Sequence, residues 1–364
     1  MQSELKYWVW LSILEGVSPR RKYILLEHFG DPAYIWEAGE AELKRSGLCT
    51  PKAISRLTDR EAKNSISVAM EQIKKCDADV ITLHDRCYPS ALKFTADPPT
   101  VLYCRGNMIS DEICVAVVGS RRATWYGLDM AKRLSRALAG HGVTVVSGMA
   151  RGVDSQAHLG AIEGGGRTIA VLGCGVDMTY PPENRELMKK IVENGAVISE
   201  YPPGTKPVPY NFPARNRIIS GLSKGVAIVE ASERSGSLIT ADFALEQGRD
   251  VFAVPGNINS AYSTGTNRLI REGAKIVTGV EDIIDELDLG KTADTMIYTD
   301  KKSGLKLSGD EKSIAQRLVC GPVHIDVIAR DCGLSIPIAS SVLVMLELSG
   351  FVEQLPGKFY KLVE

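Results

Sequence analysis

The chain has 364 residues, of which 44% are hydrophobic, and its formal net charge at pH 7 is -1. A near-neutral charge excludes a uniformly basic nucleic-acid coat protein but leaves room for a local basic groove. No run of about 20 apolar residues occurs, so we expect neither a membrane span nor a membrane partner. A chain of this length is expected to contain two or three domains.

The cysteines and the N-terminus indicate a cellular compartment. The eight cysteines are scattered singly and none forms a C-x-x-C pair, so we predict no zinc site and no bound cofactor. The first 14 residues show no signal-peptide cleavage pattern. These features predict a protein of the reducing cytoplasm.

Residues 1–75 are predicted to form a helical domain. Apolar residues at helical spacing, with Pro or Gly at the ends, indicate helices over 5–14, 20–29, 33–38, 41–46 and 51–57. Such compact helical pairs occur in helix-hairpin-helix DNA-binding modules and in plain interaction domains. The spacing alone favours interaction or packing over contact with DNA.

Residues 76–287 are predicted to form a doubly wound α/β domain. Short apolar strands are expected over 113–118, 143–146, 168–172, 196–198, 226–229, 251–254 and 275–277, with helices over 127–139, 155–163, 183–193, 217–222, 238–247 and 266–271. Strands that are apolar throughout are buried on both faces, which indicates a parallel sheet covered by helices. The ligand of such a sheet sits at the carboxyl ends of the strands, where the strand order reverses.

A polar linker is predicted over 288–307, followed by a winged helix over 308–364. Helices are expected over 311–319, 325–331 and 336–349, with a hairpin of strands over 351–354 and 359–362. The third helix carries Glu347 as its only charge, whereas reading of the major groove needs Arg, Lys, Asn or Gln. Docking of a protein is therefore at least as well supported as binding of duplex DNA.

Polar, glycine-rich turns follow several of the predicted strands. Their candidate residues are Gly119, Ser120, Arg121 and Arg122 after the first strand, Gly148 and Arg151 after the second, and Ser235, Gly236 and Ser237 after the fifth. Glycine permits close approach of a backbone, hydroxyls donate hydrogen bonds and guanidinium groups bind phosphate. All these turns open on the same edge of the sheet, which predicts a rim that binds phosphate.

The segment 207–220 adds further cations to this rim. A proline-rich loop leads into a predicted helix start at Arg215, Asn216 and Arg217, and Lys206 precedes it, with no acidic residue between Glu200 and Glu230. A helix N-terminus offers free N–H groups and partial positive charge to an anion. We expect Arg217 to face phosphate, because Arg215 has two acidic candidates for partners. The alternative is a surface loop with ordinary solvated cations.

Two known nucleotide-binding motifs are present only in part. The Gly173-Cys-Gly175 turn lacks the third glycine of a dinucleotide fingerprint, and Gly290-Lys291-Thr292 has Asp285 where a P-loop needs glycine. Asp154 is expected to cap the helix after the second strand. His158 in that helix suggests a general base, but its position favours a structural hydrogen bond.

The motifs taken together resemble the DNA-processing protein A family, DprA, also called Smf. The resemblance rests on six segments in the family's order, namely 118–121, 147–154, 157–158, 212–219, 235–238 and 254–256. It covers roughly residues 80–285, and the flanking regions match the family's N-terminal helical, sterile-alpha-motif-like domain and C-terminal winged helix. The implied fold is an extended Rossmann-like doubly wound sheet between these two domains.

The resemblance also implies a function. It implies a bacterial cytoplasmic protein that binds and protects single-stranded DNA during natural transformation, loads the recombinase RecA onto that DNA, and forms a homodimer through the Rossmann-like domain. By motif match, the DNA-contacting role passes to Ser120, Arg121, Lys206, Phe212, Arg215 and Arg217. An alternative role for Phe212 is to anchor its loop in the core. Six phosphate contacts would give a salt slope of roughly -4.

An enzymatic alternative comes from the same fold family. Phosphoribohydrolases that cleave nucleoside monophosphates resemble P-G-G-x-G-T-x-x-E, in which the Glu is catalytic. Placing Thr240 on the Thr of that signature puts Phe243 on the Glu. A phenyl ring cannot act as an acid or a base, so the sequence favours a non-enzymatic DNA-binding mediator.

Overall fold

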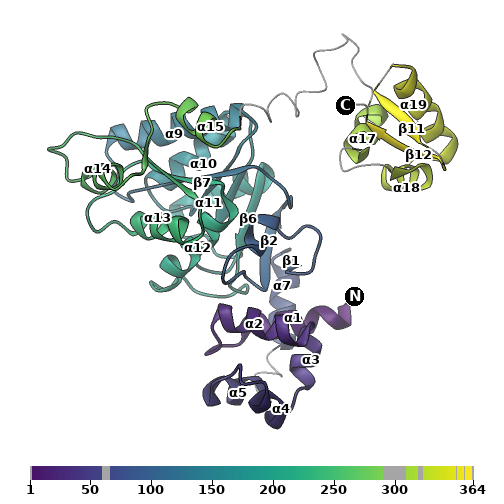
Figure 1. Ribbon diagram of the computed structural model, residues 1–364, viewed down its shortest axis with the longest axis horizontal. Coiled ribbons are helices and arrows are strands. Elements are labelled where there is room, and N and C mark those ends of the chain that lie inside the picture. The colour runs from purple at the N-terminus through teal and green to yellow at the C-terminus, as the bar shows by residue number, and fades with distance from the viewer. Residues whose placement is uncertain are drawn as a thin grey trace. The chain divides into compact units, whose positions relative to one another are not determined.

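The structure is a computed structural model that describes residues 2–59, 66–289, 309–318, 323–349, 351–355 and 357–362. The chain divides into two compact units, Met1–Ala293 and Asp294–Glu364, which we describe separately (Figure 1). Most of the predicted linker lies outside the described residues, as do Gly290-Lys291-Thr292 and Cys320.

The first unit begins with helices. Those described are α1 (Gln2–Ile13), α2 (Pro19–Phe29), α3 (Pro32–Glu37), α4 (Glu40–Arg45), α5 (Pro51–Leu57) and α7 (Ile66–Lys75). Three of them start at a proline, and the side chain before it, Ser18, Asp31 or Thr50, accepts a hydrogen bond from a first-turn N–H. The helices predicted over 5–57 are confirmed, and α7 is additional.

These helices share a hydrophobic core with the sheet that follows. Ser12 Oγ lies 2.7 Å from the hydroxyl of Tyr103 on β2 (Val101–Gly106), and Lys22 Nζ donates to the Ser12 carbonyl oxygen. Burial lowers the pKa of Lys22 to about 8, although Glu200 and Glu15 oppose the shift. The helical region and the sheet therefore form one unit, and a domain boundary at residue 75 stays a prediction.

The centre of the first unit is a mostly parallel nine-stranded sheet, which confirms the predicted fold class. Its order is β1-β2-β6-β5-β4-β3-β7-β8-β9. The remaining strands are β1 (Asp79–Thr82), β3 (Cys114–Val118), β4 (Thr144–Ser147), β5 (Thr168–Val171), β6 (Gly195–Ser199), β7 (Gly225–Ile228), β8 (Asp250–Ala253) and β9 (Lys275–Ile276). The strands from β6 to β9 along this order are parallel, and β1 and β2 extend the sheet in antiparallel pairing.

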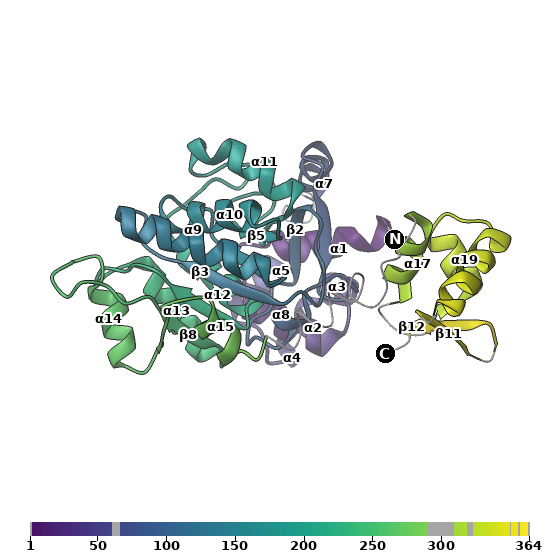
Figure 2. The same cartoon turned by 90° about the horizontal axis from the view of Figure 1, so that it is seen from above.

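Helices cover both faces of the sheet. They are α8 (Ser90–Lys93), α9 (Trp125–Gly140), α10 (Val153–Glu163), α11 (Arg185–Glu193), α12 (Asn211–Leu222), α13 (Gly236–Glu246), α14 (Thr264–Arg271) and α15 (Glu281–Glu286), with a 3-10 turn at Pro182–Asn184. Figure 2 shows α9, α10 and α11 on one side of the strands and α12 and α13 on the other. Side chains of β3 alternate between two buried clusters, Val115 and Val117 in one and Ala116 and Val118 in the other, as burial of both faces requires.

The strand order reverses between β3 and β7. The chain leaves β3 toward β4 on one side and leaves β7 toward β8 on the other. Loops from adjacent strands therefore diverge at their carboxyl ends and leave a crevice there. Gly119 follows β3 and Glu230 lies just beyond β7, so the predicted rim borders this crevice.

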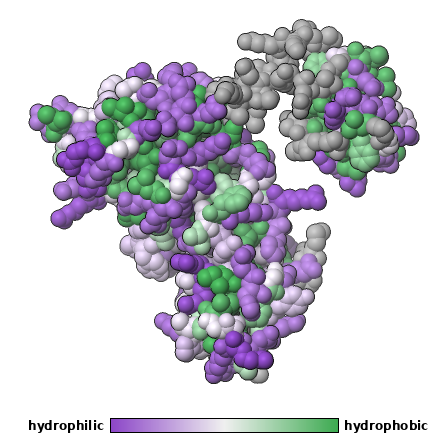
Figure 3. Space-filling model, viewed as in Figure 1, coloured by the Kyte–Doolittle hydropathy of each residue, from purple (hydrophilic) through white to green (hydrophobic). Residues whose placement is uncertain are grey.

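The second unit is a winged helix, as predicted. It contains α17 (Gly309–Leu318), α18 (Ile325–Asp331) and α19 (Ile336–Leu348), with a three-stranded antiparallel sheet of β10 (Val323–His324), β12 (Phe359–Leu362) and β11 (Val352–Leu355). Hydrophobic side chains of α19 are exposed, including Ile336, Ile338 and Leu348. Figure 3 shows hydrophobic surface on this unit. Within the described residues no single helix has the length and apolarity to cross a membrane, and the bent pair α18–α19 meets those two criteria only when both helices are counted together.

Candidate nucleic-acid interface

A pocket of about 690 Å³ opens at the carboxyl ends of β3 and β7. Ten of the predicted site residues line it: Gly119, Ser120, Arg121, Arg122, Phe212, Arg215, Asn216, Ser235, Gly236 and Ser237. Four others, Gly148, Arg151, Lys206 and Arg217, are not among its lining residues. The pocket therefore brings together most of the predicted site residues, and their environments in the structure differ.

The rim loop, residues 119–122, is held tightly to its neighbours. The Ser120 N–H donates to the Glu230 carbonyl oxygen at 2.7 Å, and the Ser120 hydroxyl accepts from the Arg122 N–H at 3.1 Å. Gly152 adopts φ +78°, and a Cβ there would collide with the Ser120 carbonyl oxygen. Arg121 and Arg122 are both exposed, and neither forms an ion pair with a carboxylate of the described residues. The loop thus presents two free cations on a fixed backbone.

Two aromatic rings lie beside these cations. The guanidinium carbon of Arg121 is 5.4 Å from the ring centre of Phe212, and Phe212 lies 5.3 Å from Tyr180 with an interplanar angle of 37°. A Cβ at Gly173 would stand 2.9 Å from the Phe212 ring, so glycine at this position makes room for it. A cation over a partly exposed aromatic pair offers both phosphate binding and a stacking surface.

Helix α12 begins earlier than predicted. It starts at Asn211 and not at Arg217, because proline is tolerated in the first turn of a helix, so Pro213 does not hold the chain in a loop. The buried side chain of Asn211 donates to the Gly173 carbonyl oxygen at 3.0 Å. Arg215 and Arg217 consequently lie within the helix, away from its free N–H groups, and the predicted helix-start anion site at these residues is wrong.

Arg215 lies at the floor of the pocket and holds the strand ends together. It is 3% exposed and donates to the carbonyl oxygens of Gly148 and Val171. Burial lowers its pKa to about 10, with Asp154 opposing that shift and Arg121 adding to it. Neither Glu200 nor Glu230 pairs with Arg215, contrary to the expected alternatives.

Arg217 is the clearest correction to the sequence-based site. Its side chain is only 6% exposed, with Nε 2.9 Å from Asp97 and Nη2 2.6 Å from Glu200. Burial tends to lower its pKa, but the two carboxylates outweigh burial and the pKa is raised. The expected free guanidinium facing phosphate is therefore wrong, because Asp97, 120 positions away, and Glu200 already neutralise it.

The remaining predicted cations differ in their freedom. Lys206 is exposed and forms no ion pair with the described carboxylates, although it lies outside the pocket lining. Arg151 is also exposed, but it pairs with Glu183. The free cations of the predicted set are thus Arg121, Arg122 and Lys206.

The start of α13 supplies neutral donors to the pocket. Ser235 caps the helix by accepting from the Ser237 N–H at 3.4 Å, and the two hydroxyls are 2.8 Å apart. Asn216 on α12 donates to the Gly236 carbonyl oxygen at 3.3 Å. The Ser235 and Ser237 hydroxyls and the N-terminus of α13 therefore add neutral donors and a partial positive charge to the pocket wall.

Two buried titratable groups near Arg215 are structural. Asp154 does not cap α10, which has Gly152 at that position, but its carboxylate accepts from the Ala150 N–H at 3.3 Å. Burial raises the pKa of Asp154 despite the nearby Arg215 cation. His158 is fully buried, with Nδ1 2.7 Å from Thr168 Oγ1, and burial lowers its pKa to about 3. The expected structural hydrogen bond is confirmed.

The pocket lacks the arrangement of an acid–base site. Asp154 is the only carboxyl among its lining residues, and Phe243 on α13 is not one of them. No cluster of His, Cys, Asp or Glu within the described ranges has the geometry to hold a metal ion. The features that the pocket does offer are free cations, aromatic rings and neutral donors.

Comparison with known proteins gives the family. Residues 79–288 match the model of the family described as DNA recombination-mediator protein A, and residues 300–358 match a DprA winged helix domain. The chain belongs to this family. It is 38% identical over 307 residues to Protein Smf of Escherichia coli, covering 82% of each chain. It is 45% identical over 205 residues to DNA processing protein DprA of Streptococcus pneumoniae, covering 56% of this chain and 72% of that one.

Two solved structures of the family are similar. The X-ray structure of DprA from Streptococcus pneumoniae has a TM-score of 0.67 and 36% identity, covering 77% of this chain and 97% of its own. A structure of DprA from Helicobacter pylori, described in terms of its single-stranded DNA binding mode, has a TM-score of 0.53 and 34% identity, covering 58% of this chain and 97% of its own.

Sequence reasoning missed two aromatic residues of the pocket, Tyr180 and Tyr262. Tyr180 stands between a strand-end glycine turn and the pair Pro181-Pro182, and Tyr262 lies in the loop that precedes α14. Both follow the carboxyl ends of strands, so an aromatic side chain at such a loop was the available signal.

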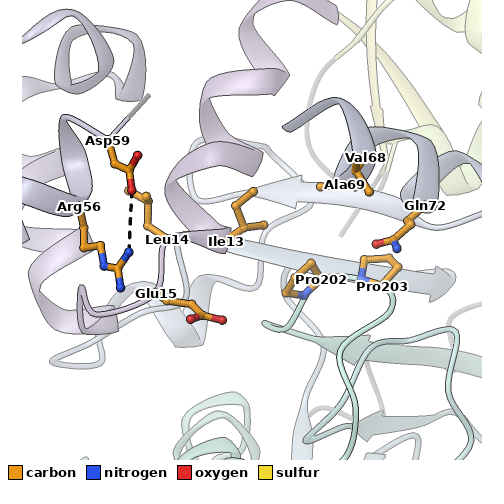
Figure 4. Close-up of a pocket in the computed structure, with 10 residues that line it drawn as sticks. All are labelled: Ile13, Leu14, Glu15, Arg56, Asp59, Val68, Ala69, Gln72, Pro202 and Pro203. Atoms are coloured by element: carbon orange, nitrogen blue, oxygen red, sulfur yellow. Dashed lines mark ion pairs between the residues drawn. The ribbon is translucent and has the colours of Figure 1, made fainter. Parts of the chain in front are cut away.

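Another hollow of about 560 Å³ lies between the N-terminal helices and the loop at Pro202 and Pro203 (Figure 4). None of the predicted site residues lines it. Its arginine, Arg56, points toward Asp59, with the closest atoms 3.8 Å apart. We therefore place the candidate interface at the strand-end pocket.

Proposed function

We propose that this chain binds single-stranded DNA in the strand-end pocket and acts as a recombination mediator. The observation that carries the proposal is the free Arg121 guanidinium placed over the ring of Phe212, which packs at a tilt against Tyr180. Single-strand binding needs cations for the phosphates and aromatic faces for the bases. The single-stranded DNA binding mode described for the Helicobacter pylori relative supports the same ligand.

The shape of the pocket favours a single strand over a duplex. Its aromatic faces are useful only to bases that are unstacked and turned outward, which a duplex does not offer. Helix α19 of the winged helix carries no Lys or Arg, so it lacks the side chains that read a major groove. We therefore assign nucleic-acid binding to the first unit.

The proposal extends to the partners of the bound strand. It includes transfer of the protected strand to the recombinase RecA, during natural transformation in the cytoplasm. The family description as a DNA recombination-mediator protein supports the mediator step alone. A homodimer formed through the Rossmann-like domain is part of this proposal, and no cofactor and no catalytic step are required.

Hydrolysis of nucleoside monophosphates is the less favoured alternative. A glycosidic bond needs a positioned acid or base. The carboxyl that lines the pocket, Asp154, is 6% exposed and bound to the Ala150 N–H, and the position of the enzymes' glutamate is occupied by Phe243.

The test measures binding of a labelled oligothymidylate and of a duplex by fluorescence anisotropy at two salt concentrations. Arg121→Ala should weaken single-strand binding by at least about tenfold. Lys224→Ala is the matched control, because Lys224 is an exposed cation at the opposite, amino end of β7. With Arg121, Arg122 and Lys206 as free cations, the slope of log K against log salt concentration should be about -2 per protomer, which is shallower than the value of roughly -4 for six contacts.

Equal single-strand affinities of Arg121→Ala and Lys224→Ala would refute the pocket as the binding site. Preference of the wild-type protein for the duplex would refute the ligand. Transfer to RecA is tested by RecA filament formation on DNA coated with single-strand-binding protein. The wild-type protein should accelerate it and Arg121→Ala should not, and an absence of acceleration by wild type would remove the mediator step while leaving the binding step intact.

A further inference from the structure

Trp125 is the most exposed of the four tryptophans of the chain. It is 80% exposed, whereas Trp8 and Trp10 are buried at 6% and 0% and Trp36 is half-buried. Tryptophan is highly buried on average because its large ring is costly to hydrate. A ring of this size left in solvent next to a second exposed aromatic residue, Tyr126, offers a surface to another molecule.

Folding gives no reason for a tryptophan at this position. Trp125 is the first residue of α9, and the helix start is capped by Thr124, whose hydroxyl accepts from the Gly127 N–H. Trp125 is absent from the hydrophobic clusters of the described residues. A smaller residue would therefore satisfy the helix equally well.

The backbone that carries Trp125 is nevertheless fixed. The Glu230 carboxylate accepts from both the N–H and the hydroxyl of Thr124, at 2.8 and 2.7 Å. Glu230 also binds the rim loop through its carbonyl oxygen, which accepts from Ser120. Glu230 thus holds both the rim loop and the start of α9 in place. Because its backbone is already fixed, Trp125 loses little conformational entropy when it binds a ligand.

Trp125 is followed in sequence by a second exposed aromatic residue, Tyr126. Tyr126 is 42% exposed, and its hydroxyl donates to the Pro255 carbonyl oxygen at 3.0 Å. That bond ties α9 to the loop after β8, which carries Tyr262, a 39% exposed residue of the pocket wall. The hydrogen bond of Tyr126 thus joins the helix that begins with Trp125 to the loop that carries Tyr262.

The cations of the rim loop lie on the same path. Only Ala123 and Thr124 lie between Arg122 and Trp125, so the two α-carbons are at most about 11 Å apart, which is a span of about two nucleotides. Arg121 and Arg122 would hold phosphates between a base in the pocket and a base on Trp125. A purely apolar protein contact would instead bury these unpaired guanidinium groups at a cost.

We infer that Trp125, supported by Tyr126 and Tyr262, is a second stacking platform for bases of the single strand that leave the pocket. This inference rests on the proposed function, since it concerns the path of the same ligand. It assigns the rim arginines to phosphates that lie between two base-stacking sites. Strands too short to reach Trp125 would fill only the pocket.

The experiment compares two oligothymidylates on the full chain, one of two nucleotides, which is too short to fill the pocket and reach Trp125 together, and one of about sixteen. Trp125→Ala should weaken binding of the longer strand by about five- to a hundredfold and leave the shorter strand unchanged. Trp125→Phe, which keeps a ring, should restore most of the affinity, and Trp125→Leu, which keeps only apolar area, should not. The longer strand should also quench tryptophan fluorescence in wild type, and Trp125→Phe should abolish that quenching.

Equal affinity of wild type and Trp125→Ala for the longer strand, with no quenching, would overturn the inference while the pocket assignment stands. A loss of self-association or of RecA stimulation in Trp125→Ala, at unchanged DNA affinity, would assign the tryptophan to a protein contact and would also overturn it. A wild-type protein that binds neither strand would refute the proposed function and this inference together. An equal loss for both lengths would place Trp125 inside the pocket site and contradict the two-platform arrangement.

Discussion

The arginines of the rim loop and those of α12 have opposite environments, although all four were expected to face the same ligand. Arg121 and Arg122 are exposed and unpaired with the described carboxylates, whereas Arg215 and Arg217 are buried, the first bound to backbone carbonyl oxygens and the second paired with two carboxylates. The rim loop therefore presents charge to a ligand, and the α12 arginines fix the strand ends that shape the pocket. Position in a cationic segment does not by itself make an arginine a ligand-binding residue.

This contrast predicts the largest effect at Arg217. Arg217→Ala would leave the carboxylates of Asp97 and Glu200 near one another without their cation, and we expect a loss of about 3–5 kcal/mol in the free energy of unfolding. Arg121→Ala removes an exposed group and should change stability by no more than about 0.5 kcal/mol. Urea unfolding monitored by circular dichroism measures both.

Equal effects of the two variants on stability would contradict this distinction between the rim loop and α12. A destabilisation by Arg121→Ala as large as that by Arg217→Ala would show that the rim loop also depends on its arginine for folding. Arg217→Ala combined with Asp97→Asn should recover part of the lost stability, because one uncompensated charge is removed.

A second large effect is expected at low pH from His158, which is fully buried and close enough to Arg215 to feel its charge. In the unfolded chain a histidine takes up a proton near pH 6.5, whereas the pKa of His158 in the folded chain is about 3. The folded state therefore loses stability relative to the unfolded state as the pH falls from about 6.5 toward 3. The loss should reach roughly 3 kcal/mol between pH 7 and pH 4.

The matched variant is His158→Gln, which keeps a hydrogen-bond donor for Thr168 but does not titrate. The unfolding free energies of wild type and variant, measured from pH 7 to pH 4, should converge or cross as the pH falls. Parallel curves would show that His158 is accessible to protons in the folded chain.

The contrast also explains how much the sequence could predict. The strands were identified because they are apolar throughout, and the pocket because Gly119, Ser147–Gly152 and Ser235 follow strands whose carboxyl ends meet at one edge. These are local signals with a fixed geometric consequence. The family motifs in the same turns point to the same edge.

The roles of individual arginines could not be predicted, because they depend on contacts distant in sequence. Asp97 and Glu200 neutralise Arg217 across the fold, and the Gly148 and Val171 carbonyls bind Arg215. The helix start was placed too late because proline was taken as a helix boundary, although it also fits a first turn.

A smaller effect on single-strand affinity is expected from substitution of Phe212. This substitution tests base stacking separately from charge within the pocket. Phe212→Leu keeps apolar volume but removes the ring between Arg121 and Tyr180. Single-strand affinity should fall by about tenfold, since stacking of a base on an aromatic ring contributes roughly 1–3 kcal/mol. Phe212→Tyr is the control and should bind almost as wild type, and anisotropy titrations at fixed salt distinguish them. Unchanged affinity in Phe212→Leu would leave Arg121 as a cation without a stacking partner.

The smallest effect is expected at Arg151, which stands between the two classes because it is exposed yet paired with Glu183. If freedom from carboxylates decides which arginine binds DNA, Arg151→Ala should change single-strand affinity by no more than about twofold, since an exposed ion pair already neutralises the cation. Glu183→Gln is the informative complement, because it frees Arg151 and should strengthen binding and steepen the salt dependence if the side chain reaches the strand. A loss in Arg151→Ala as large as that in Arg121→Ala would show that exposure alone is sufficient and that DNA displaces Glu183. The relevant distinction among the arginines would then be between buried and exposed groups, and pairing with a carboxylate would not matter.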